Sequence, residues 1–312
     1  MLFKRWITAI ILIPFLLLIL LKGNPLAFSL LIAVITIISM KEYFTIVSSC
    51  KFHSVSPENS SPDPPENDNQ SHRSDKFSES TASDKAGCDN SSCYSIPLKI
   101  KICGYSASML IIFAAHKGSS EMVLFMVALN IMAVFIAVLK NFPLKSNCLD
   151  FFAKEIQGII YIPVFLSFLV FIRNSPNGAL WIIWLWLVIG ASDTGAYYCG
   201  TYFGKRPLAP KISPNKTMEG SAGGLAAAVI AGSIFGLIFI PDISFVMLFL
   251  FAFTASAAGQ MGDLFESALK RAGCIKDSGV ILPGHGGLLD RIDGLIFAAP
   301  IAFLFKCFIA NM

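Results

Sequence analysis

Carboxylates and cations gather between positions 263 and 293, although only 14% of the chain is charged. At 3.6 residues per turn, Asp263, Glu266, Ser267 and Lys270 would share one face of a short helix. This helix is expected to begin where an apolar segment ends and to stop at Gly273, a residue type that commonly terminates helices. The spacing therefore places acidic groups beside a cation, although an ordinary salt-bridged helix face would look the same.

Asp290, Arg291 and Asp293 open the last apolar segment of the chain. The two aspartates lie one helical turn apart on the same side. Carboxylate oxygens at that spacing suit a hard divalent cation such as Mg²⁺, which keeps water and substrate phosphates among its ligands. N-terminal capping of the helix would also explain one aspartate, but two aspartates around an arginine indicate more than a cap.

A turn rich in glycine precedes these aspartates, with the sequence Pro283-Gly284-His285-Gly286-Gly287. Such a backbone can bring peptide N–H groups close to an anion, although most glycine turns are only turns. His285 could transfer a proton, or it could be a structural hydrogen-bonding residue. The turn is a candidate for function only because charged residues surround it in the sequence.

A second polar group lies earlier in the chain. Ser192 and Asp193 fall near the end of a strongly apolar segment, where an ionisable side chain is a candidate for function. Ser213, Lys216 and Thr217 precede the next apolar segment, where hydroxyls, an ammonium and a helix start could contact a phosphate. Capping alone would also account for the two hydroxyls. The segment is not a Walker A loop, because the GxxxxGK[ST] pattern is absent.

The elements that must position these residues are membrane helices. The 312 residues are 55% apolar and have a mean hydropathy of +0.67, which excludes soluble, collagen-like, mucin-like and disulfide-stapled classes. Nucleic acid is not an expected partner, and the eight scattered cysteines are expected to be reduced. The predicted fold is an all-α polytopic membrane protein with about nine transmembrane helices and a polar site at its cytoplasmic face. The expected spans are 6–21, 25–40, 102–115, 122–139, 156–172, 178–195, 220–240, 243–262 and 294–310.

The distribution of charge predicts the orientation. With a cytoplasmic N-terminus and nine alternating helices, 20 of the 24 basic residues fall on the cytoplasmic side. Lys22, Lys117 and Arg173 fall on the other side, and Lys306 falls within the last span. Inversion would violate the positive-inside rule, so both polar groups are expected at the cytoplasmic face.

One segment differs from all the others. Residues 55–92 are rich in Ser, Pro, Asp and Asn and contain almost no large apolar side chains. Such a segment cannot bury enough surface to offset its backbone entropy, so we predict a disordered cytoplasmic insertion. The predicted organisation is an N-terminal transmembrane hairpin and flank at 1–54, this insertion at 55–92, and a catalytic transmembrane domain at 93–312.

The pattern from Ser267 to Asp293 resembles the signature of the phosphatidate cytidylyltransferases, also called CDP-diacylglycerol synthases. The matching residues are Ser267-x-Leu269-Lys270-Arg271, then Lys276-Asp277-x-Gly279, then Leu282-Pro283-x-His285-Gly286-Gly287-Leu288-x-Asp290-Arg291-Ile292-Asp293. The segments SDTGAY and SPNKTMEG, from Ser192 and Ser213, are similar to that family as well. The resemblance implies an Mg²⁺-dependent membrane enzyme, with or without a second cation, that makes CDP-diacylglycerol and pyrophosphate from phosphatidate and CTP.

The resemblance also suggests a role for each candidate residue. A phosphate oxygen of phosphatidate would attack the α-phosphorus of CTP in line, while cations neutralise the phosphates. Asp263 and Asp290, followed by Asp293 and Asp193, are the expected metal ligands. The residues expected to act on phosphate charge are Lys270, Arg271, Lys276 and Arg291, with His285 as a candidate acid or base. The expected substrate-binding residues are Ser192, Ser213, Lys216, Thr217 and Ser267.

Two alternatives remain open at this stage. A transporter would place charges near the bilayer midplane and would contain paired broken helices, and neither feature is evident. A CTP-dependent lipid or polyisoprenoid kinase would release CDP in place of pyrophosphate. The compact chain favours a bacterial inner membrane as its location, and a homodimer is compatible with the sequence.

Overall fold

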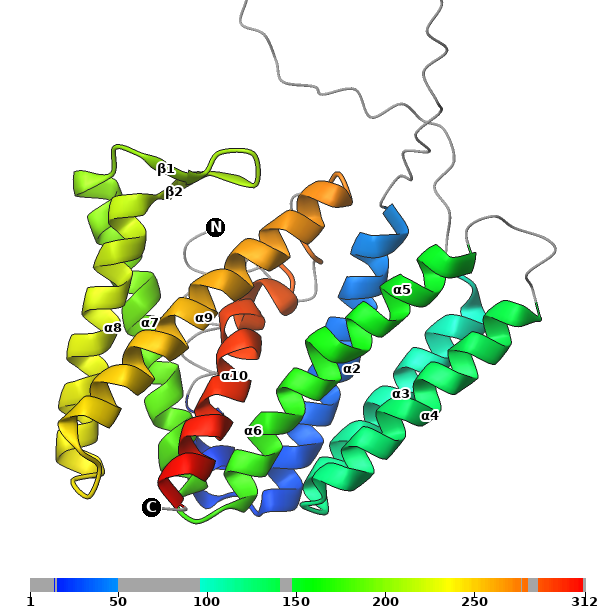
Figure 1. Cartoon of the computed structure of the whole chain (residues 1–312), viewed down its shortest axis with the longest axis horizontal. Helices are drawn as coiled ribbons and strands as arrows, with labels where there is room; N and C mark the ends of the chain where they lie inside the picture. Colours follow the sequence, from blue (N-terminus) through cyan, green and yellow to red (C-terminus); the bar gives the residue numbers. More distant parts are fainter. Residues whose placement is uncertain are drawn as a thin grey trace, which may run out of the picture.

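The computed structural model describes residues 14, 16–49, 96–140, 148–275, 277–279 and 286–310. Within them, eight helices are long and apolar enough to cross a membrane, which confirms the predicted all-α polytopic fold (Figure 1). The predicted first span, 6–21, falls largely outside the described residues, as does the predicted insertion at 55–92. The eight candidate spans are Pro25–Ser49, Leu98–His116, Ser120–Leu139, Asp150–Asn174, Gly178–Phe203, Met218–Phe239, Phe245–Ala272 and Leu289–Ile309.

Successive helices alternate in direction, so the bundle has two distinct ends (Figure 1). The end that we call the site end carries the hairpin of β1 (Pro207–Ala209) and β2 (Ser213–Thr217), the C-terminus of α9 (Phe245–Ala272) and the N-terminus of α10 (Leu289–Ala310). The far end carries the turn between α6 (Phe165–Asn174) and α7 (Gly178–Phe203), together with the connection from α8 (Met218–Phe239) to α9. This alternation agrees with the arrangement predicted from the sequence.

Contacts between distant segments fix the far end. The Arg173 guanidinium donates to the backbone oxygen of Gly23, which ties α6 to the start of α2 (Pro25–Ser49). The Asn174 amide donates to the backbone oxygen of His116 at the end of α3 (Leu98–His116), which precedes α4 (Ser120–Leu139). These polar contacts satisfy helix-end carbonyls that lack partners within their own helices.

The span predicted at 156–172 is longer than expected and is not one regular helix. It consists of α5 (Cys148–Ile159), a π-helical turn (Ile160–Val164) and α6. Pro163 lies in the π turn and cannot donate a backbone hydrogen bond, which explains the break in the α-helical pattern. The turn directs Tyr161 into the core, where its ring packs edge-on against Phe265 of α9 at 4.9 Å between centroids.

The core of the bundle is aromatic, whereas much of its periphery is exposed and apolar. Trp184 and Phe251 pack with their ring centroids 4.1 Å apart, and the Trp184 indole donates to the backbone oxygen of Gly232. In contrast, Leu124 on α4 and Ile230 on α8 have more than half of their surface exposed. Exposed apolar side chains on these helices suit contact with lipid tails, since a bilayer does not penalise them.

The polar residues after position 262 do not form a separate helix, which corrects the prediction for 263–271. They are the last turns of α9, whose 28 residues correspond to about 42 Å at 1.5 Å per residue. The hydrocarbon layer is only ~30 Å thick, so the polar turns extend beyond it. Gly273 does terminate the helix, and its backbone N–H donates to the Leu269 oxygen at 2.9 Å.

The hairpin is the only strand pairing in the part of the chain that the structure describes, and it was not predicted. β1 and β2 are antiparallel, with Pro207 opposite Thr217 and Ala209 opposite Ser213. Prolines at 207, 210 and 214 disfavour a helix in this segment. Thr217 then begins α8 as its N-cap, because its side-chain oxygen accepts the Gly220 backbone N–H at 3.1 Å.

Candidate active site

A cavity of about 540 Å³, which we call the site-end pocket, lies between α7, the hairpin, α8 and α9. Asp193 from α7, Lys216 from β2 and Asp263 from α9 contribute its charged groups. Ser221 and Gln260 add neutral polar groups, and aromatic and aliphatic side chains complete the wall. A volume of this size and mixed lining are typical of sites that bind small molecules.

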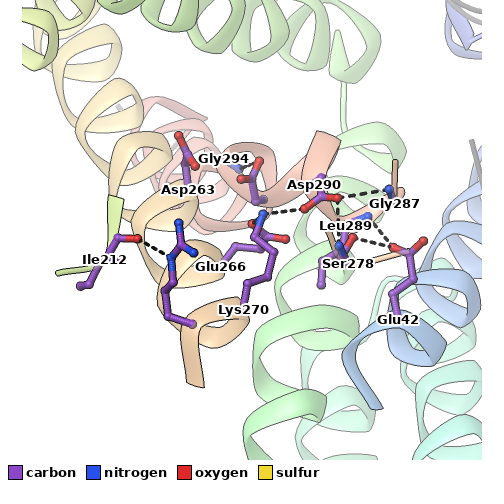
Figure 2. Close-up of polar contacts among 12 residues, drawn as sticks. Glu42, Ile212, Asp263, Glu266, Lys270, Ser278, Gly287, Leu289, Asp290 and Gly294 are labelled. Atoms are coloured by element: carbon purple, nitrogen blue, oxygen red, sulfur yellow. Dashed lines mark hydrogen bonds and ion pairs between the residues drawn. The ribbon is translucent and has the colours of Figure 1, made fainter. Parts of the chain in front are cut away.

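The hairpin brings Lys216 to the carboxylate of Asp263. The Lys216 Nζ lies 2.5 Å from an oxygen of Asp263, and both side chains are partly exposed. The hairpin is held on one side by Glu219 of α8, whose carboxylate accepts the backbone N–H groups of Lys205 and Arg206. On the other side, the Arg271 guanidinium donates to the Ile212 oxygen at 3.0 Å (Figure 2). The wall that carries Lys216 is therefore anchored to two helices.

Three aspartates from three helices form an electronegative group, of which Asp193 and Asp263 line the pocket and Asp293 lies outside its lining. Asp293 of α10 interacts electrostatically with Asp263, Asp193 and Lys216. Gly262 permits this arrangement, because a side chain at its position would collide with the Asp293 backbone oxygen. In Figure 2, Asp263 lies on the side of α9 that faces the start of α10. Like charges at close range repel one another, so a cation would stabilise the group.

The chemistry of this aspartate group fits Mg²⁺, which prefers carboxylate oxygens. Among the described residues, however, no three acidic, histidine or cysteine side chains lie close enough to enclose a metal by themselves. Mg²⁺ usually binds through one or two carboxylates and completes its shell with water and substrate phosphates. The arrangement therefore suits a cation that binds together with a phosphorylated substrate.

A hydrogen-bond network under the pocket joins α7, α8 and α9. Ser192 is buried, and its hydroxyl oxygen accepts from the Ser256 hydroxyl at 2.8 Å and from the Gln260 amide at 3.3 Å. The same amide donates to the Ser221 backbone oxygen, while the Ser221 hydroxyl donates to the Gln260 side-chain oxygen. Ser192 thus holds helices together and leaves its neighbour Asp193 at the pocket.

A second cluster contains Lys270 and Asp290. The Lys270 Nζ lies 2.6 Å from Glu266 and 2.7 Å from one oxygen of Asp290 (Figure 2). The other oxygen of Asp290 accepts the backbone N–H groups of Ser278 and Gly287, both at 3.1 Å. Both Asp290 oxygens are therefore occupied by groups of the protein, and the Lys270 charge is shared by two carboxylates.

Glu42 of α2 binds the beginning of α10 on the side opposite Lys270 (Figure 2). Its two carboxylate oxygens accept the backbone N–H groups of Leu288 at 3.0 Å and Leu289 at 2.8 Å. The Ser278 hydroxyl lies 3.4 Å from the same carboxylate. Only 3% of Glu42 is exposed, so this carboxylate serves as a buried cap for α10.

The structure separates the predicted residues into several groups. It brings Asp193, Lys216, Asp263 and Asp293 together, and it places Lys270 and Asp290 in the second cluster. Thr217 lines the pocket while capping α8, Ser213 begins β2, Ser267 is partly buried on α9, and Arg291 is exposed on α10. Lys276 and His285 lie outside the described residues.

Sequence reasoning missed Glu42, Gln260 and Ser221. Glu42 carried a usable signal, because a carboxylate within an apolar helix usually has a partner or a function. The predicted span ended at position 40 and so excluded it. Gln260 and Ser221 are neutral, and only the packing of three helices reveals that they share a network.

Fold and site together define a polytopic membrane protein with a charged pocket at one end of its bundle. Comparison with known families is more specific. The model of the family described as "Cytidylyltransferase family" matches residues 89–308. The chain therefore belongs to the Cytidylyltransferase family, as its resemblance to the phosphatidate cytidylyltransferases predicted.

Individual relatives agree with this assignment. The chain is 40% identical over 192 residues to the phosphatidate cytidylyltransferase of Bacillus subtilis, covering 61% of this chain and 70% of that protein. It is 35% identical over 198 residues to that of Staphylococcus epidermidis, covering 63% and 75% of the two chains. It is 49% identical over 122 residues to the phosphatidate cytidylyltransferase of Helicobacter pylori. These residues cover 39% of this chain and 45% of that protein.

Proposed function

We propose that this chain transfers the cytidylyl group of CTP to phosphatidate, forming CDP-diacylglycerol and releasing pyrophosphate. One observation carries the proposal: in a chain of the Cytidylyltransferase family, Asp193, Lys216 and Asp263 converge on one pocket at the end of a membrane bundle. Relatives named phosphatidate cytidylyltransferase support the choice of lipid substrate.

The location of the pocket suits two substrates of opposite solubility. Phosphatidate is confined to the bilayer, whereas CTP is highly charged and stays in water. Their reaction requires a site where apolar helices meet polar groups. In the site-end pocket, Leu208, Leu264 and Tyr197 lie within the same lining as Lys216 and Asp263, so one cavity offers both environments.

Phosphate binding is assigned to β2 and the start of α8. Lys216 supplies positive charge, and the positive end of the α8 dipole faces the pocket through Gly220 and Ser221. Asn215 and Thr217 offer further polar groups on the same strand. In this assignment, the Lys216 ammonium exchanges part of its contact with Asp263 for a substrate phosphate.

Mg²⁺ would be held by one or two carboxylates of the group formed by Asp193, Asp263 and Asp293, together with substrate phosphates and water. When bound, it would neutralise phosphate charge at the reacting centre. Asp290, the fourth predicted ligand, is assigned a different role here, because its two oxygens already bind Lys270 and the backbone of residues 278 and 287. Lys270 and Asp290 then position the start of α10, which carries Asp293.

The transfer is an in-line displacement. A phosphate oxygen of phosphatidate forms a bond to the α-phosphorus of CTP, and the bond between that phosphorus and the bridging oxygen of the β-phosphate breaks. Pyrophosphate leaves with the bonding electron pair. The attacking phosphate is already ionised, so the protein needs to orient it and offset its charge more than to remove a proton.

The orientation that we propose places the site end in the cytoplasm of a bacterial cell, with the protein in the inner membrane. Lys205, Arg206, Lys211 and Lys216 all belong to the hairpin segment, and Lys270 and Arg271 end α9 at the same end. The far end carries fewer cations, namely Lys22, Lys117, Arg173 and Lys306. This asymmetry supports a cytoplasmic site end through the positive-inside rule.

A purified-component assay tests the proposal. The full chain in detergent would be incubated with phosphatidate, Mg²⁺ and CTP labelled in its α-phosphate and cytidine. A labelled lipid and an equal amount of pyrophosphate are expected, whereas CDP without labelled lipid would indicate a kinase and contradict the proposal. D263N should lose activity, and D150N should retain it, because Asp150 pairs with Lys154 on α5 away from the pocket.

A further inference from the structure

A second cavity, of about 580 Å³, lies at the far end and takes no part in the proposed transfer reaction. We call it the far-end cavity. The α6–α7 turn, the start of α9 and the last turns of α10 form it. Its wall is largely apolar and includes Trp181, Ile243, Met247 and Phe303. The cavity therefore offers a hydrophobic surface at the end of the bundle opposite the site-end pocket.

Lys306 places a nearly buried positive charge in this cavity. Its exposed fraction is 9%, and its ammonium donates to the Pro176 backbone oxygen at 2.6 Å and lies 5.0 Å from the centre of the Trp181 ring. These neutral partners stabilise the ammonium without neutralising it. None of the carboxylates that the structure describes forms an ion pair with Lys306. A buried cation in that setting favours an anionic ligand.

Two long helices begin at the same cavity. Asn177 is the N-cap of α7 and Ser244 is the N-cap of α9, and both line the cavity. Neither side chain accepts a hydrogen bond from its own helix. Helix starts attract anions through their N–H groups and their dipoles. The N-terminal ends of two helices and the Lys306 ammonium thus all contribute positive charge to one cavity.

The depth of Lys306 indicates which anion would bind. It lies four residues before the end of α10 at Ala310, a rise of about 6 Å along a helix. A side chain at that depth lies where lipid headgroups begin, and the apolar wall next to it continues toward the acyl chains. Asp242, which is exposed, also lines the cavity and supplies a single negative charge.

We propose that the far-end cavity binds the headgroup of a phospholipid that carries a phosphate and an amine. The phosphate interacts with Lys306 and the starts of α7 and α9, the amine interacts with Asp242, and an acyl chain lies against Met247 and Phe303. The site is separate from the site-end pocket, so the inference goes beyond the proposed transfer reaction and does not depend on it.

Binding measurements on the purified full chain test the proposal. Native mass spectrometry in detergent would follow the addition of phosphatidylethanolamine, phosphatidylglycerol or inorganic phosphate. The amine-bearing lipid is expected to bind most tightly, and K306M should weaken its binding at least tenfold. K117M is the matched control, because Lys117 is also a far-end lysine near an aromatic ring, with its ammonium 5.5 Å from Phe113. Equal binding by K306M and K117M would overturn the proposal, as would equal binding of free phosphate.

Two further measurements do not require K306M to fold. Cys307 lines the cavity, whereas Cys274 is exposed near the site end, so phosphatidylethanolamine should slow maleimide modification of Cys307 several-fold and leave Cys274 unchanged. D242N should abolish the preference for phosphatidylethanolamine over phosphatidylglycerol. Unprotected Cys307 would contradict the lipid site, and an unchanged preference in D242N would contradict its selectivity for an amine.

Discussion

Glu42 accepts a 2.8 Å hydrogen bond from the backbone N–H of Leu289, which joins α2 to the start of α10. Asp290, the next residue, is held from the other side by Lys270 of α9. The start of α10 is therefore fixed between two helices. Because Asp293 lies on the following turn of α10, this clamp determines where its carboxylate lies relative to Asp263.

Replacing Glu42 by Gln should lower both stability and activity. The amide keeps the size of the carboxylate but directs an NH₂ group toward backbone N–H groups, leaving a buried donor unsatisfied at a cost of about 1–3 kcal/mol. We expect a lower unfolding temperature in detergent and a reduced kcat. E121Q is the control, because Glu121 is exposed at the start of α4 at the far end. A Glu42→Gln variant with normal unfolding temperature and kcat would show that the cap is dispensable.

Removing the Lys270 charge should destabilise the second cluster. In K270M, the carboxylates of Glu266 and Asp290 would face each other without a cation, and the loss of one partner of a buried ion pair costs about 3–5 kcal/mol. Thermal unfolding of the purified protein would measure the loss. The double variant E266Q/K270M should recover part of it, because only one of the two carboxylates then remains. If the double variant is less stable than K270M, charge repulsion is not the cause.

Lys216 should behave differently from Lys270. Its ion pair with Asp263 is partly exposed, and such pairs contribute only about 0–1 kcal/mol to stability. K216M should therefore unfold near the normal temperature, while its kcat/KM for CTP falls about 10- to 100-fold through loss of a charge-assisted phosphate contact, worth ~1.5–3 kcal/mol. K211M provides a control in the same hairpin segment. Steady-state kinetics at varied CTP would measure the effect, and an unchanged kcat/KM would remove Lys216 from the substrate site.

The sequence predicted the elements better than the contacts between them. Apolar length located the helices, and local spacing placed Lys270 near Glu266, since both lie on one helix four residues apart. Nothing in local spacing indicates that Glu42 binds Leu289, because 247 positions separate them. The hairpin was missed for a related reason: its strands are short, and their pairing is stabilised by Glu219 and Arg271 from neighbouring helices.

The surroundings of Asp290 and Asp293 show what spacing along a helix cannot predict. Asp290 and Asp293 lie one turn apart, as expected, but their surroundings differ. Asp290 faces an ammonium and two backbone N–H groups, whereas Asp293 accepts a hydrogen bond from Gly294 and lies near two other aspartates. Spacing along a helix predicts which residues share a face. It does not predict which of them another helix will neutralise.

Dependence on Mg²⁺ distinguishes Asp290 from the group formed by Asp193, Asp263 and Asp293. If the group formed by Asp193, Asp263 and Asp293 attracts and holds the cation, D193N should raise the Mg²⁺ concentration needed for half-maximal activity, because the group loses one carboxylate charge. D290N should lower kcat without changing that concentration, since it loosens the start of α10 but leaves the ligands in place. Chelation with EDTA should abolish activity in both variants and in the unmodified chain, and excess Mg²⁺ should restore it.

A direct measure of Mg²⁺ binding is the Mg²⁺-dependent rise in unfolding temperature in the presence of CTP. D193N should reduce this rise, and D290N should retain it. If D290N loses this rise and D193N keeps it, Asp290 is the ligand and the role proposed here for Lys270 must be abandoned.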